Sequence, residues 1–271
     1  MKTKLNNFFK NLFNKKDVIT FAFLKYLEFT ISAFLFFSIA KISTPSEYGD
    51  AVSDFLMITY SSFIVLGINQ VLVKWHSMSK SSLFKSFVLN YNIIFNIFFS
   101  IILFFLVLFF LKSNYLISVS IICSLKLISE GFVTVFRVQN KIFYINAVYL
   151  SSSLTFLFLF FYNVDSIELF FQSWSYSIMV GLSTGLILYL KITDFNNFIS
   201  ITKIKLFKIY KYIFLKEGIK LTLITILGTL IISVDRLFYL NLYDFSDNIL
   251  GSIQLADNIS TVVSLGIGSI L

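Results

Sequence analysis

The chain has 271 residues and a net charge of +8, and 57% of its residues are hydrophobic, 19% aromatic and only 13% charged. Because a soluble domain normally carries about 25% charged residues, this composition excludes an ordinary soluble protein and indicates that lipid covers much of the surface. The lysines and arginines are spread between apolar runs instead of forming one patch, so nucleic acid is not an expected partner.

Residues 1–16 combine apolar positions at helical spacing with four lysines among the polar positions. This pattern predicts a basic amphipathic helix that lies in the membrane interface. A cleaved signal peptide is the alternative, but the following apolar run is too long and contains Lys25 and Glu28, so we expect the segment to stay attached. The apolar positions are Leu5, Phe8, Phe9, Leu12 and Phe13.

The rest of the chain is dominated by apolar runs long enough to cross a membrane. A helix needs about 20 residues to span a hydrocarbon core of roughly 30 Å. The runs are long and do not alternate with polar residues, and a single proline and ten glycines leave few interruptions, which favours helices over an outer-membrane barrel. We therefore predict an all-α polytopic bundle of about eight transmembrane helices. The predicted spans are 18–40, 51–73, 86–111, 115–136, 142–162, 169–190, 218–240 and 250–271.

The spacing of these runs predicts two bundles. Residues 17–190 hold the first six spans, and residues 218–271 hold the seventh and the start of the eighth. Between them, residues 191–217 alternate apolar side chains with lysines at helical spacing, which predicts a second basic amphipathic helix on the membrane surface. The last span stops at Leu271 without a flanking tail.

The distribution of positive charge predicts the orientation in the membrane. Segments that would share one side hold 17 of the 22 lysines and arginines, whereas the other side holds Lys41, Lys112 and Arg236. Cytoplasmic loops of membrane proteins carry the excess of lysine and arginine. We therefore predict a multi-pass protein of a bacterial inner (cytoplasmic) membrane, with its N-terminus and residues 191–217 in the cytoplasm.

Two pairs of opposite charges lie within predicted spans. Lys25 and Glu28 are three residues apart in the first span, and Lys126 and Glu130 are four apart in the fourth, so each pair shares one helix face. Because a charge at the bilayer centre costs a few kcal/mol, about 2.5–3.5 on insertion scales, these residues are expected to face a bundle interior or an aqueous solute pathway. Alternatively, each pair is a neutral structural pair, or reaches the interface along its alkyl stem.

Asp235 and Arg236 end the seventh predicted span, where they would either line an outward-facing mouth or mark the membrane interface. Enzyme motifs are absent: the chain has neither a phosphate-binding glycine loop nor a zinc-protease motif, and Cys123 is its only cysteine. No hydrophilic segment is long enough for a soluble catalytic domain. A transporter without a bound cofactor is therefore expected rather than an enzyme.

Three groups of short motifs, in chain order, carry a resemblance. They are Ile42–Gly49 with Leu66–Gln70, then Phe136–Lys141, and finally Val234–Leu237 with Leu250–Ala256. The first group resembles the outer turn after helix one and the end of helix two in one family. The second group resembles that family's basic inner turn between helices four and five, and the third resembles its signature in helices seven and eight. That family is the polysaccharide and O-antigen flippases of the multidrug/oligosaccharidyl-lipid/polysaccharide exporter superfamily.

The resemblance implies a substrate and a mechanism. The substrate class is an undecaprenyl-diphosphate-linked oligosaccharide, which is flipped across the cytoplasmic membrane during synthesis of surface polysaccharide such as O-antigen, capsule or exopolysaccharide. Lys25, Lys126 and Arg236 would attract the diphosphate in a cationic cavity, and rocking of two bundles would move it across. Glu28 or Glu130 would couple the movement to a proton or sodium gradient. Other polysaccharide assembly proteins are the expected partners, besides the lipid bilayer.

The chain also departs from that family, whose members have twelve to fourteen helices in two bundles. A chain that stops within its eighth helix is expected to be a fragment, a natural truncation or a subunit that needs a partner. Three other functions stay open: a drug or metabolite antiporter, which would prefer an acidic cavity; a glycan polymerase or lipid-linked glycosyltransferase, which would need larger outer loops; and a non-functional truncated flippase.

Overall fold

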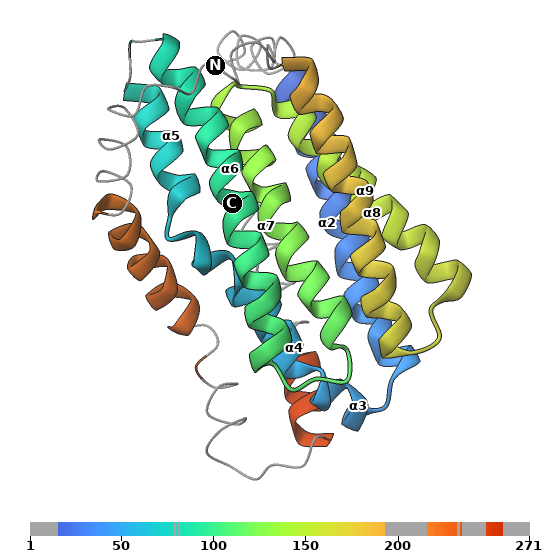
Figure 1. The fold of residues 1–271 in the computed structure, drawn as a ribbon. Coiled ribbons are helices and arrows are strands. Elements are labelled where there is room, and N and C mark those ends of the chain that lie inside the picture. The colour runs from blue at the N-terminus through green and yellow to red at the C-terminus, as the bar shows by residue number, and fades with distance from the viewer. Residues whose placement is uncertain are drawn as a thin grey trace, which may run out of the picture.

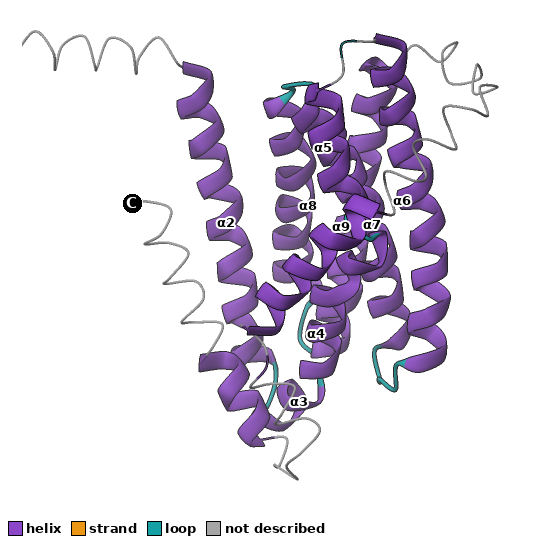
Figure 2. Cartoon of the chain, turned by 90° about the vertical axis from the view of Figure 1, so that its left-hand side faces the viewer, coloured by secondary structure: helices purple, strands orange, loops and turns teal. Residues whose placement is uncertain are grey.

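The computed structural model describes residues 16–78, 80, 82–192, 216–231, 234 and 248–256, and all regular structure among them is helical (Figure 1). The predicted interfacial helix at the N-terminus and most of the predicted linker at 191–217 lie outside the described residues. So do Asp235 and Arg236 and the C-terminal parts of the last two predicted spans. The long helices run side by side along one common direction (Figures 1 and 2).

The helices of the first 192 residues alternate in direction along the chain. Two further helical segments, 216–231 and 248–256, follow them. The elements are α2 (Lys16–Ile42), α3 (Pro45–Asp50), α4 (Val52–Tyr60), the 3₁₀-helix η1 (Ser61–Val65), α5 (Ile68–Met78), α6 (Ser82–Phe110), α7 (Leu116–Val138), α8 (Ile142–Asn163) and α9 (Ile167–Ile192).

Among the described residues, five helices are long and apolar enough to cross a membrane: α2, α6, α7, α8 and α9. The segments Pro45–Val65 and Ile68–Met78 meet at an angle of 40° and add a sixth if they form one broken span. These six segments coincide with the first six predicted spans, which confirms a polytopic all-α membrane protein. The predicted number of eight extends beyond the residues that the structure describes.

Helix α6 shows how lipid shapes this bundle, because its buried polar side chains and its most exposed apolar side chains lie on opposite faces. Asn92, Asn96 and Ser100 follow one another at helical spacing and are 0%, 0% and 3% exposed. On the opposite side, four large apolar side chains are at least 51% exposed, which suits a hydrocarbon solvent and not water. They are Phe98, Ile101, Phe105 and Phe109.

Two turns that the sequence singled out have well-defined local causes. At the start of α3, Thr44 and Glu47 form a capping box: the Glu47 backbone N–H donates to Thr44 Oγ1 at 3.3 Å, and Thr44 N–H donates to Glu47 Oε2 at 2.7 Å. At the end of α7, Asn140 has a left-handed φ of 56°. Lys141 N–H donates to the Phe136 carbonyl at 2.8 Å, which closes the turn before α8.

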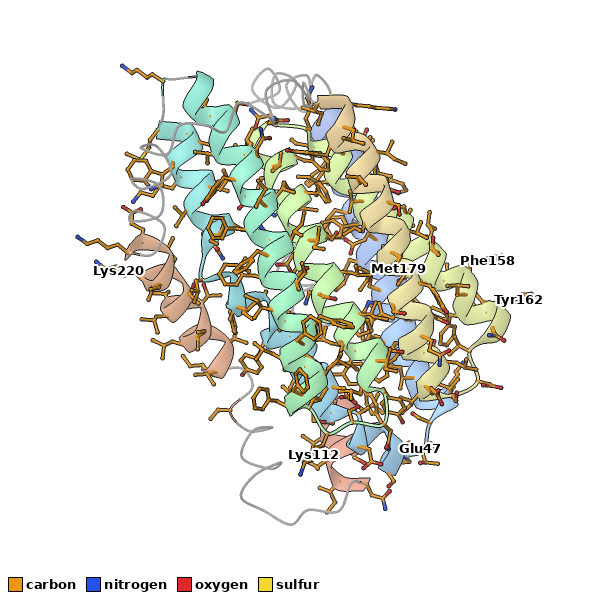
Figure 3. All side chains as sticks on the ribbon, viewed as in Figure 1. Glu47, Lys112, Phe158, Tyr162, Met179 and Lys220 are labelled. Carbon is orange, nitrogen blue, oxygen red and sulfur yellow. The ribbon has the colours of Figure 1, made fainter. Side chains whose placement is uncertain are left out.

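An aromatic cluster joins four helices towards the end of the bundle that contains α3. The ring centroids of Phe156 and Phe170 are 5.0 Å apart, and those of Phe36 and Trp174 are 5.2 Å apart. Phe55 joins the cluster from α4. At the same end, Figure 3 shows Lys112 and Glu47, while other rings of α8 project outward from the bundle. Because the hydrophobic effect between helices is weak in lipid, packing of these rings stabilises the association of the helices.

The alternation of the helices gives a testable topology. In a Cys123→Ser background, a cysteine placed at Lys80 or Asn140 is expected to react with a membrane-impermeant maleimide only after the cells are permeabilised. A cysteine at Lys112 or Asp165 is expected to react in intact cells, since these turns lie at the opposite end of the bundle and all four positions are exposed. Labelling of position 80 in intact cells would contradict the orientation.

Candidate functional site

The second span is broken near its middle, where η1 gives way to α5. Leu66 and Gly67 both adopt left-handed backbone conformations, with φ values of 49° and 68°. Only glycine adopts this conformation without cost, so Gly67 explains the position of the break. A broken helix leaves the last carbonyls of one half and the first N–H groups of the other without helical partners, and these groups need polar neighbours inside a membrane.

Lys126, from the middle of α7, supplies one such neighbour. Its Nζ donates to the Ile58 carbonyl at 3.2 Å, close to the end of α4, and the same carbonyl accepts a hydrogen bond from Ser61 Oγ at 2.6 Å. A cation at the C-terminal end of a helix also interacts favourably with the helix dipole. The ammonium group therefore stabilises the irregular part of the second span.

Glu130 lies one turn further along α7 and faces a small cavity beside the break. Among the described residues, no ion pair or hydrogen bond reaches its carboxylate, so Lys126 and Glu130 share a helix face without pairing. The cavity has a volume of about 80 Å³ and lies between the broken span, α7 and the segment 216–231. Its lining residues are Ser62, Phe63, Val65, Gly67, Asn69, Gln70, Glu130, Thr222 and Thr225.

Buried amides of α6 support the wall of this cavity. Asn96 Nδ2 donates to Asn69 Oδ1 at 3.1 Å and to the Asn92 carbonyl at 2.8 Å. Gly131 allows the amide to pack closely against α7, because a Cβ at this position would lie 3.0 Å from Asn96 Cγ. Among the described residues, Asn96 Oδ1 and both amide atoms of Asn92 have no hydrogen-bond partner. The interior beside the break is therefore rich in polar groups.

Lys25 and Glu28 form an ion pair on α2. The Lys25 ammonium also lies 4.3 Å from the ring centroid of Tyr149 on α8, which adds a cation–π contact. Tyr149 is in turn within electrostatic reach of both Glu28 and Glu130. One tyrosine thus contacts the first predicted pair and is within electrostatic reach of Glu130 from the second, although Lys25 remains 46% exposed.

The segment 216–231 lies beside α5 (Figure 1) and contacts both the break and the end of the second span. Lys74 Nζ donates to Glu217 Oε2 at 2.9 Å, and Trp75 Nε1 donates to the same oxygen at 3.3 Å. The hydrogen bond from Lys74 lowers the pKa of Glu217. At the break, a Cβ on Gly67 would lie only 2.5 Å from the Gly218 carbonyl oxygen. Two glycines therefore permit the closest approach between the two segments.

The predicted site residues thus have three outcomes. Lys25 pairs with Glu28 and contacts Tyr149, Glu130 lines the cavity beside the break, and Lys126 binds the Ile58 carbonyl there. Asp235 and Arg236 lie outside the described residues. The polar partners Asn69, Asn92 and Asn96 were not predicted. Asparagines at positions 92 and 96, four residues apart within an apolar run, were the signal that could have found the α6 face.

Comparison of the chain with family models, with curated proteins and with solved structures gives no match.

Proposed function

We propose that this protein takes part in flipping a lipid-linked oligosaccharide across the cytoplasmic membrane, as the resemblance of its motifs implies. The observation that supports the proposal most is the placement of Lys25. Its ammonium lies within a candidate span, is nearly half exposed, pairs with Glu28 and contacts Tyr149, which is within electrostatic reach of Glu130 on a third helix. A charge in this position is costly against lipid. We infer that the face formed by α2, α8 and α7 borders an aqueous cavity.

The ion pair between Lys25 and Glu28 suits an anionic substrate. Glu28 neutralises Lys25, and the Tyr149 ring contacts the ammonium on this face. A diphosphate group carries more negative charge and more acceptor oxygens than one carboxylate, so it competes effectively for the ammonium. The head group would exchange for Glu28 while the polyprenyl tail stays in the bilayer. Rocking of the bundle against the segments that follow residue 192 would then expose the head group to the other side.

A flipping assay tests this proposal. The full chain is reconstituted in liposomes with undecaprenyl-diphosphate-linked oligosaccharide, and the amount of glycan reaching the opposite leaflet is measured over time. Lys25→Ala is expected to lower the rate roughly tenfold or more, since a hydrogen bond to a charged group contributes about 1.5–3 kcal/mol. Lys25→Arg should retain most of the rate.

The matched control is Lys112→Ala, which removes an exposed lysine from the turn between α6 and α7. This variant should flip at the parent rate. A Lys25→Ala variant that equals the parent in rate would contradict the proposal, as would a parent chain that flips no lipid-linked glycan.

A further inference from the structure

We propose that Tyr149 is a positioning residue, whose ring holds the Lys25 ammonium on the face between α2 and α8 whether or not Glu28 is paired with it. The role in transport rests on the proposed function, whereas the contact itself does not. The ammonium has two partners of different kinds: the carboxylate of Glu28, one turn away on α2, and the Tyr149 ring on α8, whose centroid lies 4.3 Å from Nζ. Of these two partners, only the ring comes from another helix, so it fixes where the lysine lies relative to α8.

Contacts on either side of this pair hold the ring in place. One turn before it, Asn146 Nδ2 donates to the Phe21 carbonyl at 3.2 Å. Towards the other end of the two helices, the ring centroids of Phe34 and Phe161 are 5.8 Å apart. The partners follow in the same order along both helices, so α2 and α8 run parallel, and Tyr149 packs against the hydrophobic core between the two contacts. The ring is therefore a fixed platform, whereas lysine has a flexible four-carbon stem.

The position of Lys25 in its span makes such a platform necessary. The lysine lies in the first third of the span Thr20–Ile39, and its stem is long enough to carry the ammonium towards the nearer membrane surface. Glu28 holds the ammonium only until an anionic head group displaces the carboxylate. An aromatic face attracts a cation without carrying a net charge. The ring therefore retains the ammonium and leaves its positive charge available to the anion.

The apparent affinity for an anionic head group then depends on the ring. When the arrangement that binds a ligand is only partly populated, the affinity falls by the populated fraction. At a partly exposed site, loss of a cation–π contact corresponds to a change of roughly two- to fivefold. Without the ring, the half-saturating concentration of the lipid-linked substrate should rise by this factor, and the maximal rate should stay nearly unchanged.

The flipping assay separates the ring from the hydroxyl. Tyr149→Leu is expected to raise the half-saturating concentration roughly two- to fivefold, whereas Tyr149→Phe should match the parent. Phenylalanines that carry an increasing number of fluorines keep the shape of the ring and weaken the negative charge of its face, so the half-saturating concentration should rise with each fluorine at this position. The control is Tyr162→Leu, which changes a tyrosine of the same helix that is 80% exposed and should match the parent.

A measurement without substrate tests the contact itself. Thermal midpoints in detergent are compared for the parent, Lys25→Met, Tyr149→Leu and the double variant. Because the two side chains interact, the double variant should lose less than the sum of the two single losses. The difference should persist when Glu28 is replaced by glutamine, since the ring holds the ammonium without the carboxylate. Each fluorine on the ring should lower the midpoint of a chain with Lys25 and leave that of Lys25→Met unchanged.

Additive losses for Lys25→Met and Tyr149→Leu would overturn the proposal, as would a coupling that disappears with Glu28→Gln. A fluorinated series with constant midpoints would also overturn it, as would a half-saturating concentration that does not change when the ring is lost. If Tyr149→Phe is as impaired as Tyr149→Leu, the hydroxyl and not the ring is the group that matters, and the proposal is wrong. A chain that shows the coupling in detergent but flips no lipid-linked glycan contradicts only the proposed function.

Discussion

Replacing Gly67 by alanine is expected to lower the free energy of unfolding by about 1–3 kcal/mol, the cost of a non-glycine residue held in a left-handed conformation. The φ of 68° is one cause of this effect. The other is steric, because the new Cβ would lie 2.5 Å from the Gly218 carbonyl oxygen and 3.0 Å from Thr222 Oγ1. The backbone oxygen cannot move aside as a flexible side chain would, so the segment 216–231 must shift away from the break.

The thermal midpoint of the purified protein in detergent measures this effect. Gly228→Ala is the matched control. This glycine lies in the segment 216–231, which Gly67 contacts, and no atom lies within 4 Å of the position that its Cβ would take. Alanine is the better helix former by about 1 kcal/mol, so the control should be as stable as the parent or slightly more so. Equal midpoints for the two variants would show that the break does not need a glycine.

The second large effect is expected for Phe170→Ala, which should destabilise the bundle by about 3 kcal/mol, the lower end of the range for phenylalanine in soluble cores. Phe170 is fully buried, and its ring contacts those of Phe36, Phe156 and Trp174 from three helices. Lipid tails cannot fill the space that the ring leaves, so the dispersion contacts of its neighbours are lost. The lower end of the range applies because, in soluble proteins, part of the destabilisation comes from moving the side chain out of water. Between helices surrounded by lipid, that part of the free energy is small.

Phe109→Ala provides the control for this prediction. Phe109 is 80% exposed on the apolar side of α6, where acyl chains can replace the missing ring. Its removal should leave the midpoint of chemical or thermal unfolding nearly unchanged. If both phenylalanine variants unfold at the same midpoint, the aromatic cluster does not stabilise the contact between α2, α4, α8 and α9.

The break also gives the charges of α7 different roles. The sequence placed Lys126 and Glu130 on one face and implied a shared role in a solute pathway. In the structure, Lys126 stabilises the second span through the Ile58 carbonyl, whereas Glu130 faces the cavity and makes no ion pair or hydrogen bond with its side chain among the described residues. A lysine that serves the backbone is less available to a substrate than Lys25. For this reason, Lys25 is the residue chosen for substitution in the flipping assay.

The sequence by itself was sufficient to predict the six described spans, because a bilayer requires about 20 apolar residues for each crossing. It also left residues 41–50 and 137–141 between predicted spans, and the turns at Thr44 and Asn140 lie there. It did not predict the break at Gly67. The notable residue there is a single glycine, and the predicted span 51–73 runs across it because enough apolar residues lie on both sides.

Only the tertiary structure decided which polar groups meet. Lys25 reaches Tyr149 across 124 positions of sequence, and Asn96 reaches Asn69 from the next helix. Such contacts depend on how each helix is rotated and packed, and an inward asparagine differs from an outward one only through its neighbours. Apolar length fixes where a chain crosses the membrane, whereas packing against other helices fixes which of its charges lie next to one another.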